Sequence, residues 1–439
     1  MLAAVVAAAA VGGVILAMVL SGGSGGDSSS GTGATISPPR PTTRPATTQI
    51  TTKPVDTGGG TTTTRATTTS AAPPPPPSGP RARTFVLGTV DDSLVQRSQR
   101  FTREQVDISR DAGFDAATVS ATWQRGQRRP PAALVHVLGN VAAATRRADM
   151  QLAVVVWHGL GRDTPRTPAD RADFAAYAGA LVKLLPQVGA VIVGNEPNLS
   201  TFWKPQFGAG GSDLAARAYA DLLARSYDAI KTVRPSVLVL GGALSPRGGD
   251  RPGGSRPTHS PTTFIRDLGA AYRASGRGRP FMDAFAFHPY MEASKDSPSN
   301  RHPDNTTITV ADYPKLASLL AQAFRGTAQR GERLPVYYTE FGVQTAVPAA
   351  KRGFYTDLDS PARTDSVSFA TQAAYYRRAL ELAYCQPTVR GLFVFHTFDE
   401  PGLDGWQSGL YFADRTPKPS LPAFKRAVAD LRSGRVSCR

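Results

Sequence analysis

The sequence predicts a single (β/α)8 barrel, an α/β fold, over residues 84–439. From about Thr84 onward, short runs rich in β-branched residues alternate with longer amphipathic stretches, and there are eight such runs. The runs are apolar throughout, as strands buried on both faces of a parallel sheet are. Eight strands that are each followed by a helix match the element count of this barrel.

The expected elements can be placed along the chain from these patterns. The strands are expected at 85–90, 117–123, 152–158, 190–196, 237–244, 284–290, 335–341 and 391–398. Apolar residues at helical spacing indicate helices that include 168–185, 213–233, 261–274, 311–325, 366–384 and 421–431. The connections from helix to strand are short.

The connections after strands four to seven are long, at 197–211, 245–263, 291–310 and 343–365. All of them fall at one end of the expected barrel, the end that carries the active site in barrel enzymes.

Two segments precede the barrel. Residues 1–20 are uncharged and almost wholly apolar, about the length that a helix needs to cross a bilayer, so they are either a membrane anchor or a signal peptide. A retained anchor is favoured because no basic n-region and no clear cleavage site accompany them. Residues 21–83 are expected to form a disordered linker, since 45 of the 60 residues from Ser21 to Pro80 are Ser, Thr, Gly or Pro. Together they place the barrel outside the cytoplasm, anchored or secreted.

Composition excludes several classes of protein. The 439 residues contain only 2 Cys, too few for a disulfide-stapled miniprotein or a zinc-finger array. The formal charge of +16 is mostly arginine, without a run of five basic residues, so a solvated basic surface is favoured over nucleic-acid binding. Cys385 and Cys438 can pair in an oxidising compartment, although the sequence alone does not decide this. We expect a monomer.

Polar and aromatic residues close the expected strands and would therefore share one bowl. They are Trp123, Trp157, His158, Asn195, Glu196, His288, Tyr290, Glu340 and His396. Trp203 and Trp406 follow shortly after strand ends, so all four tryptophans lie at strand ends or just beyond. Aromatic faces in a polar bowl suit stacking on sugar rings.

Two glutamates stand out among these residues. Glu196 ends strand four in the stretch Gly-Asn-Glu-Pro-Asn, and Glu340 ends strand seven in Tyr-Thr-Glu-Phe-Gly. A carboxylate at the end of an apolar strand is costly unless it is hydrogen-bonded or used. Two carboxylates facing each other across a barrel mouth match the arrangement that glycoside cleavage requires.

These motifs, with His288-Pro-Tyr290 between them, resemble the retaining glycoside hydrolases of clan A, most closely the barrels of families 39 and 5. The resemblance implies that Glu196 is the general acid/base and Glu340 the nucleophile. It also implies that Asn195 binds the sugar hydroxyl beside the anomeric carbon, that Tyr290 orients Glu340, and that His288 and His158 line the subsite of the cleaved sugar.

Strand eight departs from the family pattern. Clan members often close it with a tryptophan over the cleaved sugar, whereas here it reads Phe-Val-Phe-His-Thr-Phe. Trp406 or Phe398 would have to take the place of that tryptophan. Asp399 and Glu400 either bind hydroxyl groups or cap the following loop.

The sequence therefore predicts a retaining glycosidase that acts on a cell-envelope or extracellular polysaccharide or oligosaccharide, without a metal or organic cofactor. A non-catalytic carbohydrate-binding protein on the same barrel and a transglycosylase remain alternatives. The sugar, the linkage, and internal or terminal cleavage stay open, as does removal of residues 1–20.

Overall fold

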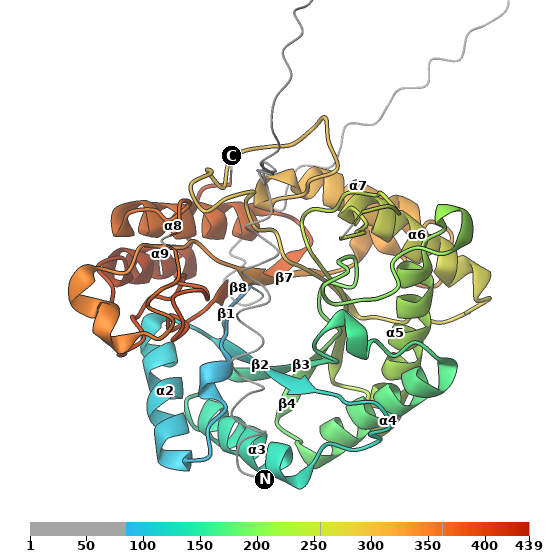
Figure 1. Cartoon of the computed structure of the whole chain (residues 1–439), viewed down its shortest axis with the longest axis horizontal. Helices are drawn as coiled ribbons and strands as arrows, with labels where there is room; N and C mark the ends of the chain where they lie inside the picture. The colour runs from blue at the N-terminus through green and yellow to red at the C-terminus, as the bar shows by residue number, and fades with distance from the viewer. Residues whose placement is uncertain (1–84, 255, 362, 439) are drawn as a thin grey trace, which may run out of the picture. The chain divides into compact units, whose positions relative to one another are not determined.

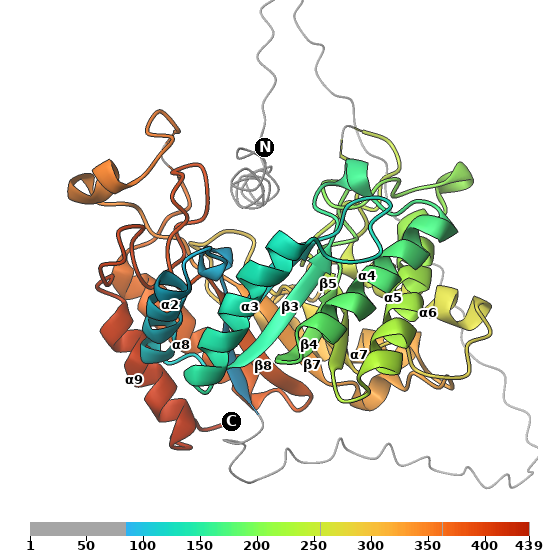
Figure 2. The same cartoon turned by 90° about the horizontal axis from the view of Figure 1, so that it is seen from below.

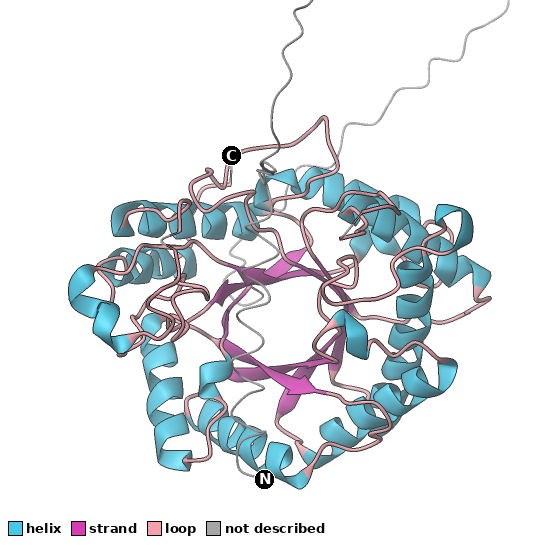
Figure 3. Ribbon diagram, viewed as in Figure 1, coloured by secondary structure: helices cyan, strands magenta, loops and turns pink. Residues whose placement is uncertain are grey.

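Eight parallel strands close into a barrel, and the helices stand around it (Figures 1 and 3). The computed structural model describes residues 85–254, 256–361 and 363–438. The strands follow one another around the barrel in chain order, and β1 pairs with both β2 and β8. The predicted (β/α)8 architecture is thereby confirmed.

The strands are β1 (Val86–Val90), β2 (Ala116–Thr122), β3 (Gln151–Trp157), β4 (Val188–Val193), β5 (Leu238–Leu244), β6 (Ala284–Phe287), β7 (Val336–Phe341) and β8 (Val389–Phe395). The α-helices are α2 (Gln99–Ala112), α3 (Ala132–Arg147), α4 (Pro168–Leu184), α5 (Leu214–Val233), α6 (Pro261–Ala274), α7 (Tyr313–Ala323), α8 (Phe369–Cys385) and α9 (Leu421–Arg432). Short 3-10 helices lie at Asp92–Leu94, Gly161–Asp163, Ala209–Gly211, Val310–Asp312, Gly331–Arg333 and Ala349–Phe354.

Strands β4 and β6 are shorter than the sequence suggests. The expected strand 190–196 ends at Val193, because the backbone turns away at Gly194, which has a φ of 81°, and again at Glu196, with a φ of 38°. The expected strand 284–290 ends at Phe287. Glu196, His288 and Tyr290 therefore stand on the loops just beyond the ladder. The sequence had suggested that these residues end the strands, whereas in the structure they follow the strands.

The strands bury both faces. Val191 and Val193 of β4 belong to the large apolar cluster that also contains residues of the surrounding helices, whereas Ile192 belongs to a small cluster with Leu240 of β5. Alternation between two clusters follows from the two-residue period of a strand, which points successive side chains to opposite faces. It explains why the strand runs are apolar throughout.

Several helices begin at a capping residue that the sequence supplies. The side chains of Ser98, Thr167, Asp213, Ser260 and Ser368 each accept a hydrogen bond from a backbone N–H in the first turn of the helix that follows. Such caps satisfy N–H groups that have no partner within the helix and define where it starts.

Long loops follow the carboxyl ends of the strands. They occupy the end of the barrel that is uppermost in Figure 2, as expected for the connections after β4 to β7. The connection from β8 to α9, residues 396–420, is also long, and the sequence analysis did not count it among the insertions. It lies with the other long loops at this end of the barrel.

The predictions for residues 1–20 and 21–83 lie outside the described residues. Within residues 85–438, apart from 255 and 362, no helix combines the length and the apolar composition that membrane crossing requires.

A disulfide joins Cys385 at the end of α8 to Cys438 in the C-terminal tail, across a sequence separation of 53 residues. The pairing that the sequence left open is present. Closing a chain segment of this length restricts the unfolded state, which stabilises the folded state by about 2–4 kcal/mol.

We predict that replacing both cysteines, Cys385→Ser with Cys438→Ser, lowers the free energy of unfolding by about 2–4 kcal/mol. Urea unfolding followed by tryptophan fluorescence measures this difference. The wild type in the presence of dithiothreitol should unfold at the same urea concentration as the double variant. An unchanged midpoint in both samples would contradict the prediction.

Candidate active site

The two glutamates meet around one histidine. Nδ1 of His288 lies 3.2 Å from Oε1 of Glu196 and 3.5 Å from Oε2 of Glu340. These two carboxylate oxygens can therefore be no farther apart than the sum of the two distances. Glu196 is 2% exposed and Glu340 is 7% exposed, so both carboxyl groups are buried at the mouth of the barrel.

The backbone around each glutamate directs its side chain. Glu196 adopts a left-handed conformation, in which its N–H donates to the carbonyl oxygen of Ala243 at 2.8 Å and anchors the turn to β5. Such a conformation is unfavourable for a residue other than glycine, and strain of this kind is concentrated at functional sites. Glu340 lies where the pairing of β7 with β8 shifts register between Tyr338 and Phe341. A shift in register re-aims a side chain relative to a regular strand.

Burial raises the pKa of both carboxyl groups to different values. It raises the pKa of Glu196 to about 8, against the opposing charge of Arg247. It raises the pKa of Glu340 to about 7, where His288 and a hydrogen bond from Tyr290 lower the value and the charge of Glu196 raises it. Tyr290 donates that bond from its hydroxyl to Oε2 of Glu340 at 3.0 Å. Glu340 is consequently the first of the two to ionise.

Two further histidines at the mouth are neutral at physiological pH. Burial lowers the pKa of His158 to about 4 and that of His396 to about 3. Nε2 of His158 lies 2.6 Å from the carbonyl oxygen of Phe202, so this nitrogen carries the hydrogen and Nδ1 is left as an acceptor. Nε2 of His396 lies 3.9 Å from Oε1 of Glu400.

Several buried polar atoms of the mouth have no hydrogen-bond partner among the described residues. They are Nε1 of Trp157, Nδ1 of His158, Oε2 of Glu196, Nδ1 of His396 and Nε1 of Trp406. Unpaired buried polar groups are rare in folded proteins and call for a physical explanation. The set combines donors and acceptors, and a hydroxyl-rich ligand could pair with both.

The structure separates the four tryptophans into two pairs. Trp406 packs against Tyr290 at a ring distance of 5.2 Å, in the apolar cluster that Trp157 also contacts. Trp123 and Trp203 lie instead in the large cluster between strands and helices, where each is at most 1% exposed. Trp123 packs on Phe174, and Trp203 packs edge-on between His158 and Tyr219. The structure thus does not bring Trp123 and Trp203 to the glutamates.

Asn195 immediately precedes Glu196 and is partly exposed at the mouth. Asn198, which stands two residues after Glu196, is fully buried. The peptide bond between Phe395 and His396 at the end of β8 is cis.

The loop after β8 is held by its own acidic residues. Oε2 of Glu400 accepts a hydrogen bond from the backbone N–H of Trp406 at 2.8 Å, and the N–H of Glu400 donates to the carbonyl oxygen of Trp406 at 3.0 Å. A Cβ atom at position 405 would lie 2.2 Å from the same Oε2, so Gly405 makes room for this contact. Asp399 accepts a hydrogen bond from the N–H of Gly409 at 3.0 Å. These contacts match the capping alternative for Asp399 and Glu400.

A buried ion pair within the loop after β8 also bonds to residues of the loop after β7. Nζ of Lys418 lies 2.6 Å from Oδ1 of Asp399, and both side chains are fully buried. Lys418 also donates to Oγ1 of Thr345 and to the carbonyl oxygen of Gln407, each at 2.9 Å. Tyr355 donates to Oδ2 of Asp399 at 2.8 Å. Because Gln407 directly follows Trp406, this network fixes the loop that carries the tryptophan.

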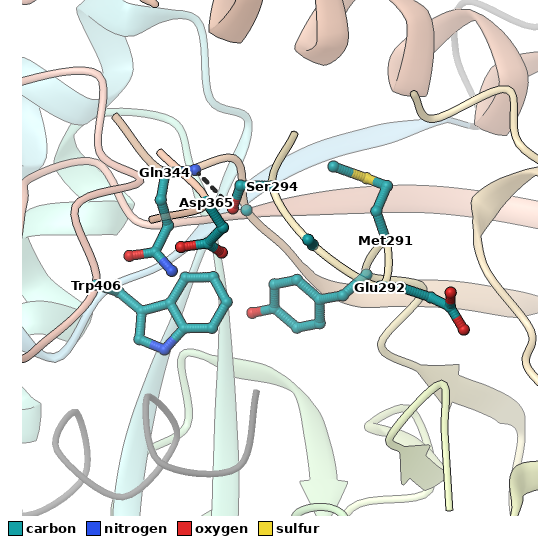
Figure 4. A pocket seen from close by; sticks show the side chains of 9 residues that line it. Met291, Glu292, Ser294, Gln344, Asp365 and Trp406 are labelled. Atoms are coloured by element: carbon teal, nitrogen blue, oxygen red, sulfur yellow. Dashed lines mark hydrogen bonds between the residues drawn. The ribbon is translucent and has the colours of Figure 1, made fainter. Parts of the chain in front are cut away.

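A pocket opens beside Tyr290 and Trp406, between the loops that follow β6, β7 and β8 (Figure 4). Its volume, open mouth included, is about 270 Å³. It is lined by Tyr290, Met291, Glu292, Ala293, Ser294, Gly342, Gln344, Asp365 and Trp406. The backbone N–H of Gln344 donates to Oγ of Ser294 at 3.2 Å, which joins two of its walls.

Sequence reasoning missed part of this site. It found Tyr290 and Trp406 but did not find Arg247, Lys418 or the pocket-lining residues Glu292, Ser294, Gln344 and Asp365, because none of these closes a strand or belongs to a recognisable motif. The long insertions at the active-site end were the signal that further wall residues existed.

Comparison with known structures supports the fold. A β-glycosidase, BGL167, is 16% identical, with a TM-score of 0.51 over 81% of this chain and 98% of its own. A GH5_18 protein from Streptomyces cattleya, crystallised with GlcNAc, is 19% identical, with a TM-score of 0.54 over 80% of this chain and 81% of its own. SghA, a virulence factor from Agrobacterium tumefaciens, is 14% identical, with a TM-score of 0.52 over 80% of this chain and 97% of its own.

These similarities establish that the chain has the barrel fold on which such glycoside hydrolases are built, consistent with the clan A resemblance of its motifs. Neither a protein-family profile nor a curated protein matches the sequence.

We predict that Lys418→Met destabilises the protein by about 3–5 kcal/mol, because it leaves the carboxylate of Asp399 buried without its counter-charge. Lys418→Met combined with Asp399→Asn removes both charges and should recover part of this loss. Urea unfolding of the two variants and the wild type measures the difference. A double variant less stable than Lys418→Met alone would contradict the assignment of the loss to an unpaired charge.

Proposed function

We propose that the protein is a retaining glycoside hydrolase that cleaves O-glycosidic bonds, with Glu340 as the nucleophile and Glu196 as the general acid/base. The observation that carries this proposal is the pair of buried carboxyl groups that share His288. The two carboxylate oxygens that face His288 lie within the sum of these two distances, which is compatible with the ~5–5.5 Å between the carboxyl groups of retaining glycosidases.

The proposed reaction has two steps. In the first, the carboxylate of Glu340 attacks the anomeric carbon while the carboxylic acid of Glu196 gives its proton to the departing glycosidic oxygen. In the second, Glu196, now ionised, takes a proton from a water molecule whose oxygen attacks the same carbon and releases Glu340. The order of the two pKa values agrees with these roles, since Glu340 has the lower pKa and Glu196 holds its proton to higher pH.

The unpartnered polar atoms of the mouth supply contacts for the sugar. Nε1 of Trp157 and Nε1 of Trp406 can donate to hydroxyl oxygens, and Nδ1 of His158 can accept from a hydroxyl group. Trp406 and Tyr290 present an aromatic wall next to Glu340. Asn195 remains our candidate for the hydroxyl group beside the anomeric carbon.

We further propose that the enzyme acts outside the cytoplasm on a polysaccharide or oligosaccharide of the cell envelope. The apolar residues 1–20 and the Ser/Thr/Gly/Pro-rich residues 21–83 suggest tethering, and a disulfide is typical of oxidising compartments.

We predict that Glu340→Ala reduces turnover of aryl β-glycosides to background, because no residue remains to form the glycosyl ester. Glu196→Ala should lower turnover by about 10²–10⁴-fold for sugar leaving groups. It should lower turnover much less for a nitrophenol leaving group, which departs without a proton. Release of nitrophenol and of new reducing ends measures these effects.

Glu332→Ala is the matched control, because Glu332 is exposed and precedes β7 at the opposite end of the barrel. It should behave as the wild type. Cleavage by Glu340→Ala at the wild-type rate would refute the proposed nucleophile.

We also predict a bell-shaped pH dependence of kcat/KM with its optimum between about 7 and 8. Activity should fall below pH 7 as Glu340 gains a proton and above pH 8 as Glu196 loses one. Initial rates on a glycoside with a sugar leaving group measure the profile. With a nitrophenol leaving group the alkaline decline should weaken, and an equally steep decline would argue against Glu196 as the acid.

A further inference from the structure

The pocket beside Trp406 adjoins the proposed nucleophile. Tyr290 lines this pocket, and its hydroxyl group donates to Oε2 of Glu340 at 3.0 Å. Gly342, which stands two residues after Glu340, lines the pocket as well. A chemical group that enters the pocket therefore lies beside the sugar that is held at Glu340.

Gln344 directs an amide donor into this pocket. The residue is 1% exposed, and its backbone N–H donates to Oγ of Ser294 at 3.2 Å. Its Oε1 accepts from the backbone N–H of Gln407 at 3.2 Å, which fixes the orientation of the amide. Nε2 is left without a hydrogen-bond partner among the described residues. A buried donor of this kind calls for a physical explanation.

Asp365 supplies a charged acceptor to the same pocket. Nε of Arg363 donates to its Oδ1 at 3.3 Å, and Oδ2 has no donor among the described residues. The guanidinium carbon of Arg363 lies 5.9 Å from the ring centroid of Trp406, so the arginine contacts two sides of the pocket. In Figure 4 the amide of Gln344 and the carboxylate of Asp365 both point toward Trp406.

The order of the strands places this pocket on the side of Glu340 that is away from Asn195. The lining residues follow β6, β7 and β8, whereas Asn195 follows β4, and β5 lies between. The anomeric carbon of a pyranose has two ring neighbours, C2 and the ring oxygen. With Asn195 at the hydroxyl group on C2, the ring oxygen and the C5 atom beyond it face the pocket.

We propose that Gln344 and Asp365 are specificity-determining residues that bind a hydroxymethyl group on C5, so that the enzyme selects neutral hexopyranosides. This inference rests on the proposed function. A hydroxyl group can accept from Nε2 of Gln344 and donate to Oδ2 of Asp365 at the same time. Its methylene group would contact the apolar wall that Met291 and Trp406 provide.

Two related classes of sugar fit this pocket less well. A pentopyranoside has no substituent on C5, so it would leave the donor of Gln344 and the acceptor of Asp365 unpaired next to the bound ring. A uronic acid would bring its carboxylate to the carboxylate of Asp365, and like charges at short range repel each other.

The test uses glycosides that differ only at C5, namely the 4-nitrophenyl β-glucoside, β-xyloside and β-glucuronide, with the same set in the galacto configuration. They are compared on the full chain and two variants. Gln344→Glu keeps an oxygen for the N–H of Gln407 and replaces the donor by an acceptor, and Asp365→Ala removes the other acceptor. Asp359→Ala is the matched control, because Asp359 is an exposed residue of the same loop.

We expect kcat/KM of the wild type to be higher for the hexoside than for the pentoside by about 10–10²-fold, since hydrogen bonds to charged groups are among the stronger ones. Each pocket variant should reduce this ratio, and Asp365→Ala should also reduce the discrimination against the uronide. Asp359→Ala should keep the wild-type ratios. A merely structural effect would lower kcat/KM for all three glycosides alike and leave the ratios unchanged.

Equal kcat/KM values of the wild type for hexoside and pentoside, or ratios that the two pocket variants leave unchanged, would overturn the inference without touching the proposed function. If the wild type releases no sugar, calorimetric titration with the methyl β-glucoside and the methyl β-xyloside makes the same comparison. Tighter binding of the glucoside that both pocket variants lose would then retain the pocket and reject the proposed function. Equal binding of the two sugars, or binding of neither, would overturn both.

Discussion

A closed ring of parallel strands has one rim at which every strand ends, and the candidate site depends on this constraint. His288 contacts Glu196 across a separation of 92 residues, and Tyr290 contacts Glu340 across 50. No local sequence preference could bring these groups together. The parallel ladder does so because each helix returns the chain to the opposite rim, so that each following strand delivers its last residues to the same place. The long loops after β4 to β8 then build a wall around that point.

Burying two carboxyl groups at this rim raises the pKa of both, and the surrounding residues determine how far each pKa rises. His288 lies within reach of both groups, the hydroxyl of Tyr290 donates to Glu340, and the charge of Arg247 acts on Glu196. Glu340 therefore has two nearby groups that favour its ionised form, which gives it the lower pKa. Oε2 of Glu196 has no partner among the described residues, which agrees with the proton exchange with a ligand that we propose for this group.

The sequence was most informative where a residue's role follows from strand order. Apolar runs and helical periods predicted the barrel, and the ends of strands four, six and seven indicated the residues that surround the two glutamates. The bounds of β4 were less predictable, because the left-handed turns at Gly194 and Glu196 are held by hydrogen bonds to β3 and β5, at Val156 and Ala243. Trp123 and Trp203 show a second limit: a position near a strand end does not reveal whether a side chain turns toward the mouth or toward the helices. Arg247 and Lys418 depend on loop geometry that no pattern in the sequence encodes.

The distribution of charge constrains the sugar that the proposed function can accept. The chain carries a formal charge of +16, yet two other carboxyl groups, those of Glu196 and Asp92, act on the candidate nucleophile. Glu196 and Asp92 raise the pKa of Glu340, and Asp91, Asp92 and Asp404 raise that of Glu400, which burial brings to about 7. A carboxylate on the sugar ring bound at Glu340 would add to this repulsion and favour the protonated, unreactive form of the nucleophile. The proposed mechanism therefore fits a neutral ring at the point of cleavage, while the net positive charge of the chain favours the approach of an anionic polymer over longer distances.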